Sequence, residues 1–87
     1  MHAVVVKATL NDREAAQRML NGQVVPRVSQ APGFVTGHWT WKDNTGLTII
    51  IFASEDAAQG MSEQVRSMVD DSVTIEDVEV REVVAHA

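Results

Sequence analysis

The chain has 87 residues, of which 45% are hydrophobic and 22% charged, a balance that is ordinary for one small globular domain covering residues 1–87. It has no cysteine, which excludes disulfides, thiolate catalysis and zinc–cysteine sites. The formal net charge of -5 argues against a nucleic-acid partner, because phosphates require a basic face. Its apolar runs are far shorter than a membrane span, so we expect no membrane contact. The absence of cysteine is compatible with a reducing cytoplasm, which is the location we expect.

The first third of the chain predicts a strand followed by a helix. Residues 3–10 (AVVVKATL) are rich in β-branched side chains, which favour a strand. Asn11 is the expected helix cap, and Glu14, three residues later, completes a pair that resembles a capping box. Pro26 lacks a backbone N–H, so we expect a kink or short break near it. Apolar residues recur every four positions on one face of this helix: Ala16, Leu20, Val24 and Val28.

The middle of the chain, residues 33–53, predicts two strands around a turn. The second strand is expected from Gly33 to Lys42, and the sequence DNTG at 43–46 is typical of a turn. The third strand is expected from Leu47 to about Ala53. Both of its faces are apolar over residues 49–52, so this strand needs cover on both sides.

The last third predicts a second helix and a fourth strand. Ser54 is the expected N-cap of the helix. The apolar stripe of this helix is Ala57, Met61, Val65 and Met68, with Ala58 and Val69 beside it. The fourth strand lies somewhere in Val73 to Ala85, where the apolar alternation changes phase. A bulge or bend near Glu76 and Asp77 would explain that change.

The order of elements is therefore βαββαβ. This order predicts an α+β, ferredoxin-like fold: a four-stranded antiparallel sheet with two helices on one face and the first and third strands at its centre. Two helices cover one face only. The other face would still carry part of residues 4–6 and 49–52, and an apolar patch of that size on a small protein predicts a homodimer through the sheet.

The segments PRVSQAPGFVTGHW and GLTIIIFASEDAA resemble the small dimeric α/β-barrel proteins, a group that includes antibiotic-biosynthesis monooxygenase-like domains. The resemblance covers nearly the whole chain. It implies a dimeric α/β barrel, in which two sheets pack face to face. The group includes cofactor-free monooxygenases, haem-degrading enzymes, isomerases and cyclases, so the fold alone does not choose among these activities.

The catalytic patterns of two activities in that group are not matched. The cofactor-free quinone-forming members use Asn, Trp and Tyr side chains, whereas this chain has no tyrosine. The haem degraders carry a Trp and a proximal His around the second helix, and residues 61–71 contain neither. His2, His38 and His86 also lack the spacing of metal ligands. We therefore expect no haem, no metal and no other cofactor.

His38 is the candidate catalytic residue, as a general base or a substrate-orienting group. On the predicted second strand it shares a face with Phe34, Thr36 and Thr40, which we assign to substrate binding. That face would combine an apolar surface, hydroxyl groups and one group that titrates near neutral pH. The alternative is a half-exposed or hydrogen-bonded histidine on an edge strand, without a role in chemistry.

Trp39 and Trp41 share the opposite face of the same strand. They are assigned to substrate binding as an aromatic wall for a planar ligand. The alternative is packing in the core or in a dimer interface, where tryptophan contributes a large contact area.

The leading hypothesis is a small-molecule enzyme that resembles the cofactor-free monooxygenases and acts on a hydrophobic or aromatic substrate in a pocket between sheet and helices. The alternative is a non-catalytic homodimer with a ligand-binding or structural role. Ligand-dependent oxygen uptake would separate the two. An RNA-recognition domain shares the strand order, but acidity and the lack of a basic aromatic strand disfavour it.

Overall fold

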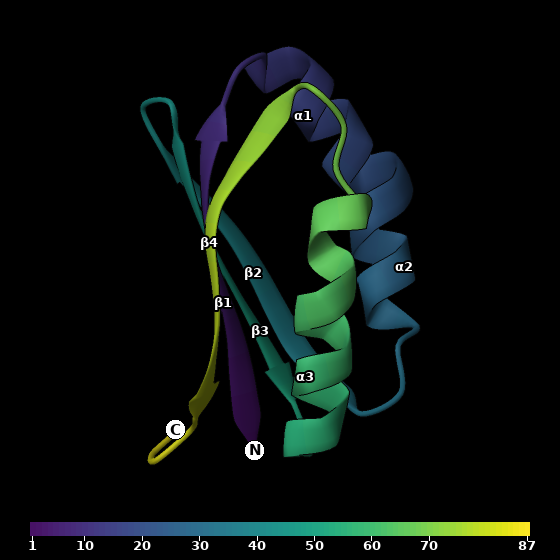
Figure 1. The fold of residues 1–87 in the computed structure, drawn as a ribbon, viewed down its shortest axis with the longest axis vertical. Helices are drawn as coiled ribbons and strands as arrows, with labels where there is room; N and C mark the ends of the chain where they lie inside the picture. Colours follow the sequence, from purple (N-terminus) through teal and green to yellow (C-terminus); the bar gives the residue numbers. More distant parts are fainter.

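The structure is a single antiparallel sheet with helices packed on one of its faces (Figure 1). It is a computed structural model that describes all residues, 1–87. The strands lie in the order β2-β3-β1-β4 across the sheet. They are β1 (His2–Leu10), β2 (Phe34–Lys42), β3 (Thr45–Phe52) and β4 (Val73–Glu82). The predicted ferredoxin-like fold is confirmed, as are the central positions of the first and third strands.

The first helix is one continuous run of three segments. They are α1 (Arg13–Met19), the π-helical segment η1 (Leu20–Val24) and α2 (Val25–Ser29). The backbone N–H of Val25 bonds to the carbonyl of Leu20, five residues back. Pro26, the next residue, has no N–H to donate, so the hydrogen-bond spacing changes just before it. The expected irregularity near Pro26 is confirmed.

The cap of the first helix lies one residue later than predicted. Asp12 is the N-cap, and its Oδ1 accepts a hydrogen bond from the Ala15 N–H at 3.1 Å. Asn11, the predicted cap, instead donates from Nδ2 to Thr74 Oγ1 at 2.8 Å. Its side chain therefore ties the end of β1 to β4 rather than starting the helix.

The second helix, α3 (Glu55–Gln64), continues into the 3₁₀ turn η2 (Val65–Ser67). Ser54 caps it as predicted, because its Oγ accepts from the Ala57 N–H at 3.2 Å. No helix of the chain is long and apolar enough to cross a membrane.

The turn between β2 and β3 is tighter than predicted. Lys42 pairs with Thr45, which leaves Asp43 and Asn44 as the turn, and Asp43 has a φ of 54°. Gly46, expected in the turn, is a strand residue opposite Trp41.

Two irregularities shift the register of the edge strands. In β4, Lys7 pairs with Asp77 but Ala8 pairs with Ile75, so Glu76 is an extra residue and the predicted bulge is confirmed. In β2, the register shifts between Phe34 and Thr36. No sequence signal predicted this second shift, and it changes the face to which Phe34 belongs.

The core lies between the sheet and the helices. Its largest fully buried side chains come from both layers: Val4, Val28, Ile50 and Phe52. The predicted stripe of the first helix is confirmed, because all four of its members are buried: Ala16, Leu20, Val24 and Val28. In the second helix Met61, Val65 and Met68 are buried as predicted, whereas the stripe is centred on the buried Ala58 and leaves Ala57 half-buried.

Candidate functional site

A small cavity lies between the helices and the sheet, with a volume of about 40 Å³. Fourteen of its 16 lining residues are hydrophobic, and the other two are Gly46 and Thr48. No lining side chain titrates. A space of this size holds a few water-sized spheres, but apolar walls offer water too few partners to stay. The cavity is therefore a dry site, suited to a hydrophobic group.

Trp39 and Trp41 form the β2 wall of this cavity. Each indole lies close to a glycine. A Cβ built on Gly37 would come within 2.9 Å of the Cη2 and Cζ3 atoms of Trp39, and one built on Gly46 would lie 3.4 Å from Trp41 Cδ1. The two glycines therefore make room for the two rings against the sheet.

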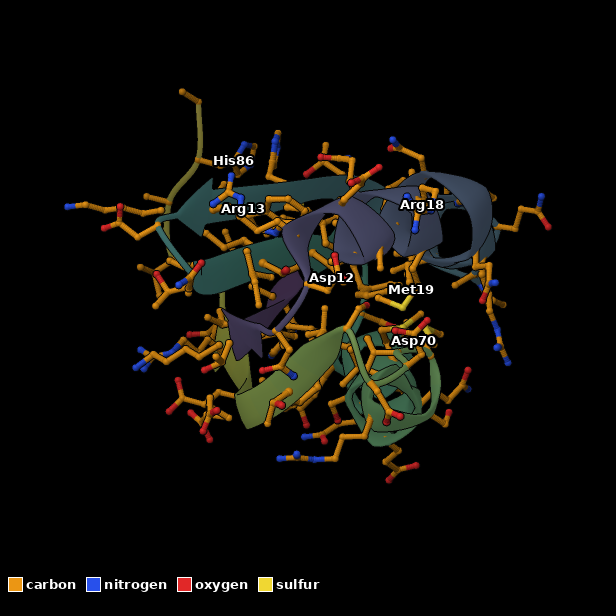
Figure 2. The ribbon with its side chains drawn as sticks, turned by 90° about the horizontal axis from the view of Figure 1, so that it is seen from above. Asp12, Arg13, Arg18, Met19, Asp70 and His86 are labelled. Atoms are coloured by element: carbon orange, nitrogen blue, oxygen red, sulfur yellow. The ribbon has the colours of Figure 1, made fainter.

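Arg13 contacts Trp41 at one end of the cavity. Its guanidinium carbon lies 5.2 Å from the centre of a Trp41 ring, and its Nη1 donates to the carbonyl oxygen of Asp43. Figure 2 shows Arg13 extending from α1 toward the end of the β2–β3 hairpin. A cation over an indole face is attractive, so this arginine joins the start of α1 to the hairpin and to Trp41.

Met19 lines the cavity on the helical side and is joined to the segment before β4. The backbone N–H of Asp70 donates to Met19 Sδ at 3.3 Å, and the two residues lie side by side in Figure 2. The Asp70 carboxylate accepts from Ser72 Oγ at 2.5 Å and from the Ser72 N–H at 2.9 Å. These bonds, that of the Ser72 side chain first, lower the pKa of Asp70 below its usual value.

The residues predicted to form one site are divided between the two faces of the sheet. His38 pairs with Ile49 and is exposed on the face away from the helices, and it does not line the cavity. Thr36 and Thr40 lie on that outer face with it. The hydroxyl of Thr40 donates to the Leu47 carbonyl at 2.6 Å.

Phe34 lies on the helix side, so the prediction that it shares a face with His38 is wrong. Its ring is 6.3 Å from that of Phe52, at an interplanar angle of 77°. Phe52 is fully buried in the core. The register shift after Phe34 is the reason, because one extra residue in a strand moves the preceding side chain to the other face.

His38 lies instead in a row that crosses the outer face. It pairs with Ile49, Ile49 pairs with Val5, and Val5 pairs with Glu79. The apolar members of this face belong to the two central strands, and its polar members stand on the two edges and at Lys7 of β1, which pairs with Leu47 and Asp77. His2 is remote from this row: its Nε2 lies 3.2 Å from Glu55 Oε2, at the start of α3.

The sequence predicted the two tryptophans as site residues, but it did not predict the residues that position them, which are Gly37, Gly46 and Arg13. The pairing of Trp41 with Gly46 depends on the hairpin register, which the sequence left open. Gly37 stands two residues before Trp39, on the same face of the strand. This spacing is a sequence signal that the indole of Trp39 lies over the glycine. The role of Arg13 has no signal in the sequence.

Comparison with known proteins gives a likeness in fold. No family model and no curated protein matches the chain. Among solved structures, it is similar to the heme degrader MhuD from Mycobacterium tuberculosis, in a structure with two hemes bound in its active site. The two share 14% sequence identity over 98% of each chain, with a TM-score of 0.60. At this identity the likeness concerns the fold alone, and it agrees with the ferredoxin-like arrangement of strands and helices described above.

Proposed function

We propose that this protein binds a flat, hydrophobic small molecule between its sheet and its helices. The observation that supports this proposal is the cavity lining: two indoles on one wall, aliphatic side chains on the others, and no titratable group. Removing apolar surface from water is worth roughly 25 cal/mol per Å². Affinity would therefore come from dry contact with the rings of Trp39 and Trp41.

The cavity must open to admit such a molecule. Its volume of about 40 Å³ is far below the roughly 300–1,000 Å³ of typical ligand pockets. Trp39 and Trp41 are only half-buried and stand on an edge strand. Their rotation, or an outward shift of the facing helical run, would enlarge the space without breaking the centre of the sheet.

Oxygenation of the bound molecule is a second candidate function, favoured by the fold shared with MhuD. The cavity offers the Thr48 hydroxyl and the indole N–H groups but no base. The substrate would have to lose a proton to solvent by itself and give O₂ four electrons in all. Two are transferred as the C–O bond of a substrate hydroperoxide forms, and two more as the remaining C–H bond and the O–O bond break, which leaves a carbonyl on the substrate carbon and releases water.

His38 remains our candidate general base, with Thr36 and Thr40 as substrate contacts, for a reaction on the outer face. A partner would have to cover that face to exclude water. We propose a homodimer for this reason and because Val5, Leu47, Ile49 and Ile51 lie on the same face, where Leu47 is 40% exposed. Two copies packed through these residues would form the two-sheet barrel that the resemblance implies.

The residues of the cavity do not fit a haem. No histidine, cysteine or tyrosine lines it, and Met19 carries the only sulfur in the lining. That sulfur already accepts a hydrogen bond from the Asp70 N–H. The volume is also too small for a tetrapyrrole. We therefore derive no step through haem, and haem-free function stays a prediction for this chain.

The tryptophans make the binding proposal directly testable. The chain has two tryptophans and no tyrosine, so near-ultraviolet emission comes from the proposed site alone. The neutral naphthalene dye Prodan absorbs in the range of indole emission, and bound dye would quench both rings by energy transfer. We expect saturable quenching by Prodan, and oxygen uptake with an ionisable hydroquinone would support the second candidate.

A cavity-filling variant gives the control. Ala8 lines the cavity, and Ala8→Leu should weaken Prodan binding by roughly tenfold, which is about 1.4 kcal/mol. Ala53→Leu makes the same change at an exposed position outside the cavity and should leave the affinity unchanged. Absence of quenching in the wild type, or equal binding by both variants, would contradict the proposal.

A further inference from the structure

We propose that the groove beside edge strand β2 is the outer half of the ligand site, and that it selects a flat apolar molecule with an uncharged polar end. This inference rests on the proposed function and adds the route and the ligand class. The groove has a volume of about 320 Å³ and lies between the first helical run and β2. Its lining residues are Gln17, Leu20, Asn21, Val25, Trp39 and Trp41.

The groove and the cavity share one wall. Leu20, Trp39 and Trp41 line both spaces. These three side chains therefore stand between the surface and the dry interior. A ligand that lies in the groove already touches the two indoles, and displacement of the three side chains would bring it into the cavity.

The backbone around this wall is suited to local opening. Leu20 begins η1, where hydrogen bonds span five residues instead of four, and Pro26 just beyond it donates none. On the other side, β2 is hydrogen-bonded to β3 alone, because it is an edge strand. Opening here leaves the pairing of β1, β3 and β4 intact, and segments with fewer backbone constraints open at lower free energy.

The polar residues of the groove define the ligand class. Gln17 and Asn21 are exposed carboxamides, which can donate and accept hydrogen bonds, and none of the six lining residues is charged. A hydroxyl, carbonyl or amide on the ligand would find partners here. A positively charged end would lose hydration without gaining an opposite charge, and it would lie near the Arg13 guanidinium beside Trp41, which is unfavourable. The apolar rings would lie inward, against Trp39 and Trp41.

The absence of cysteine allows a reversible block of the groove. Asn21→Cys introduces the only thiol of the chain, and a neutral benzyl methanethiosulfonate reagent would cap it. Stopped-flow quenching should then show that capping slows Prodan association by roughly tenfold and that reduction restores it. Gln23→Cys is the matched control, because Gln23 is exposed on the same helical run and lies outside the groove. Capping at this position should leave the rate unchanged.

A charged analogue tests the ligand class. A derivative of Prodan that carries a trimethylammonium group at its acyl end should bind roughly tenfold more weakly than Prodan itself. Equal affinity for the two dyes would overturn the proposed selectivity. If Prodan binds and Ala8→Leu weakens it, but the cap on the Asn21→Cys thiol does not slow association, the cavity remains the binding site and the groove is not its route. If wild-type protein does not bind Prodan at all, the proposed function and this inference both fail.

Discussion

The two faces of the sheet are built from the same four strands, yet they offer different chemistry. The helix-facing side encloses a dry cavity with two indoles and no titratable side chain. The outer side is open, with an apolar centre, His38 on one edge strand and Glu79 on the other. Neighbouring residues of a strand point to opposite faces, so the run GHWTW sends its tryptophans to one site and His38 to the other. The candidate base and the apolar cavity are therefore separated by the thickness of the sheet.

The largest expected change in stability comes from a comparison of two adjacent isoleucines of β3. Ile50 is fully buried on the helix side, whereas Ile49 is half-buried on the outer side. Ile50→Lys would bury an unpaired charge and lower the free energy of unfolding by about 4 kcal/mol or more, enough to unfold much of a marginal domain. Ile49→Lys should leave a folded monomer, because its charge can reach water once the proposed dimer separates.

Circular dichroism with urea unfolding measures the first change, and light scattering measures the second. A wild-type monomer at micromolar concentration would contradict the proposed dimer. An Ile49→Lys variant as unfolded as Ile50→Lys would show that both faces are equally essential to the fold, which would remove the contrast.

The next effect concerns the glycine beneath Trp39. Gly37→Ala would place a methyl group 2.9 Å from the indole ring, so the ring must move. We expect a loss of about 1–3 kcal/mol in the free energy of unfolding, as for other overpacked sites. Gly22→Ala is the control, since a Cβ there meets nothing within 4 Å, and it should gain up to about 1 kcal/mol from helix propensity. Equal effects in urea titrations would show that the glycine is not needed to seat the ring.

These contrasts also show which parts of the fold the sequence could predict. Hydrophobic periodicity is a local property, and it located both helical stripes and the central strands. The phase change around Glu76 and the proline at position 26 are local signals as well, and both irregularities are present in the structure.

The site was harder to predict because it depends on which face of β2 meets the helices. Both faces of this strand carry aromatic or polar residues, so composition did not choose between them. The register shift after Phe34 then moved one ring to the helix side. The cavity and the groove arise from packing between segments distant in the sequence, such as Leu20 and Trp39, and no single segment encodes such a space.

A smaller effect is expected at the end of the cavity. Arg13→Gln would remove the cation beside Trp41. The free energy of unfolding should fall by about 0.5–1 kcal/mol, which is the usual contribution of a cation–π contact at an exposed site. The Trp41 emission should change at the same time. Arg18→Gln is the control, because Arg18 is also on α1 but pairs only with Glu14, four residues earlier, at 3.2 Å. A pair of that kind contributes about 0.3–0.5 kcal/mol, and its loss should leave the emission unchanged. Identical spectra for the two variants would show that Arg13 does not hold Trp41.

Ser72→Ala should have a pH-dependent effect on the helix side. The bonds from Ser72 lower the pKa of Asp70 in the folded state. A lowered carboxyl pKa contributes stability above the unfolded pKa, and this is lost as the pH falls through the folded value. The free energy of unfolding of Ser72→Ala should therefore fall below that of the wild type at pH 7, and the difference should become smaller in acid. Urea unfolding across that range measures it, and a deficit independent of pH would show that the Ser72 bond does not act through the Asp70 charge.

The smallest structural effect is expected for His38→Ala, and it separates the two faces most sharply. His38 is exposed, and no hydrogen bond or ion pair joins its side chain to the rest of the protein. Its loss should change the free energy of unfolding by no more than about 0.5 kcal/mol. Prodan binding should also be unchanged, because His38 does not line the cavity or the groove. If oxygen uptake nevertheless falls in His38→Ala while Trp39 and Trp41 still report full binding, the base acts on the outer face. If uptake also stays at the wild-type rate, His38 has no part in the reaction, and the helix-facing side must supply both binding and chemistry.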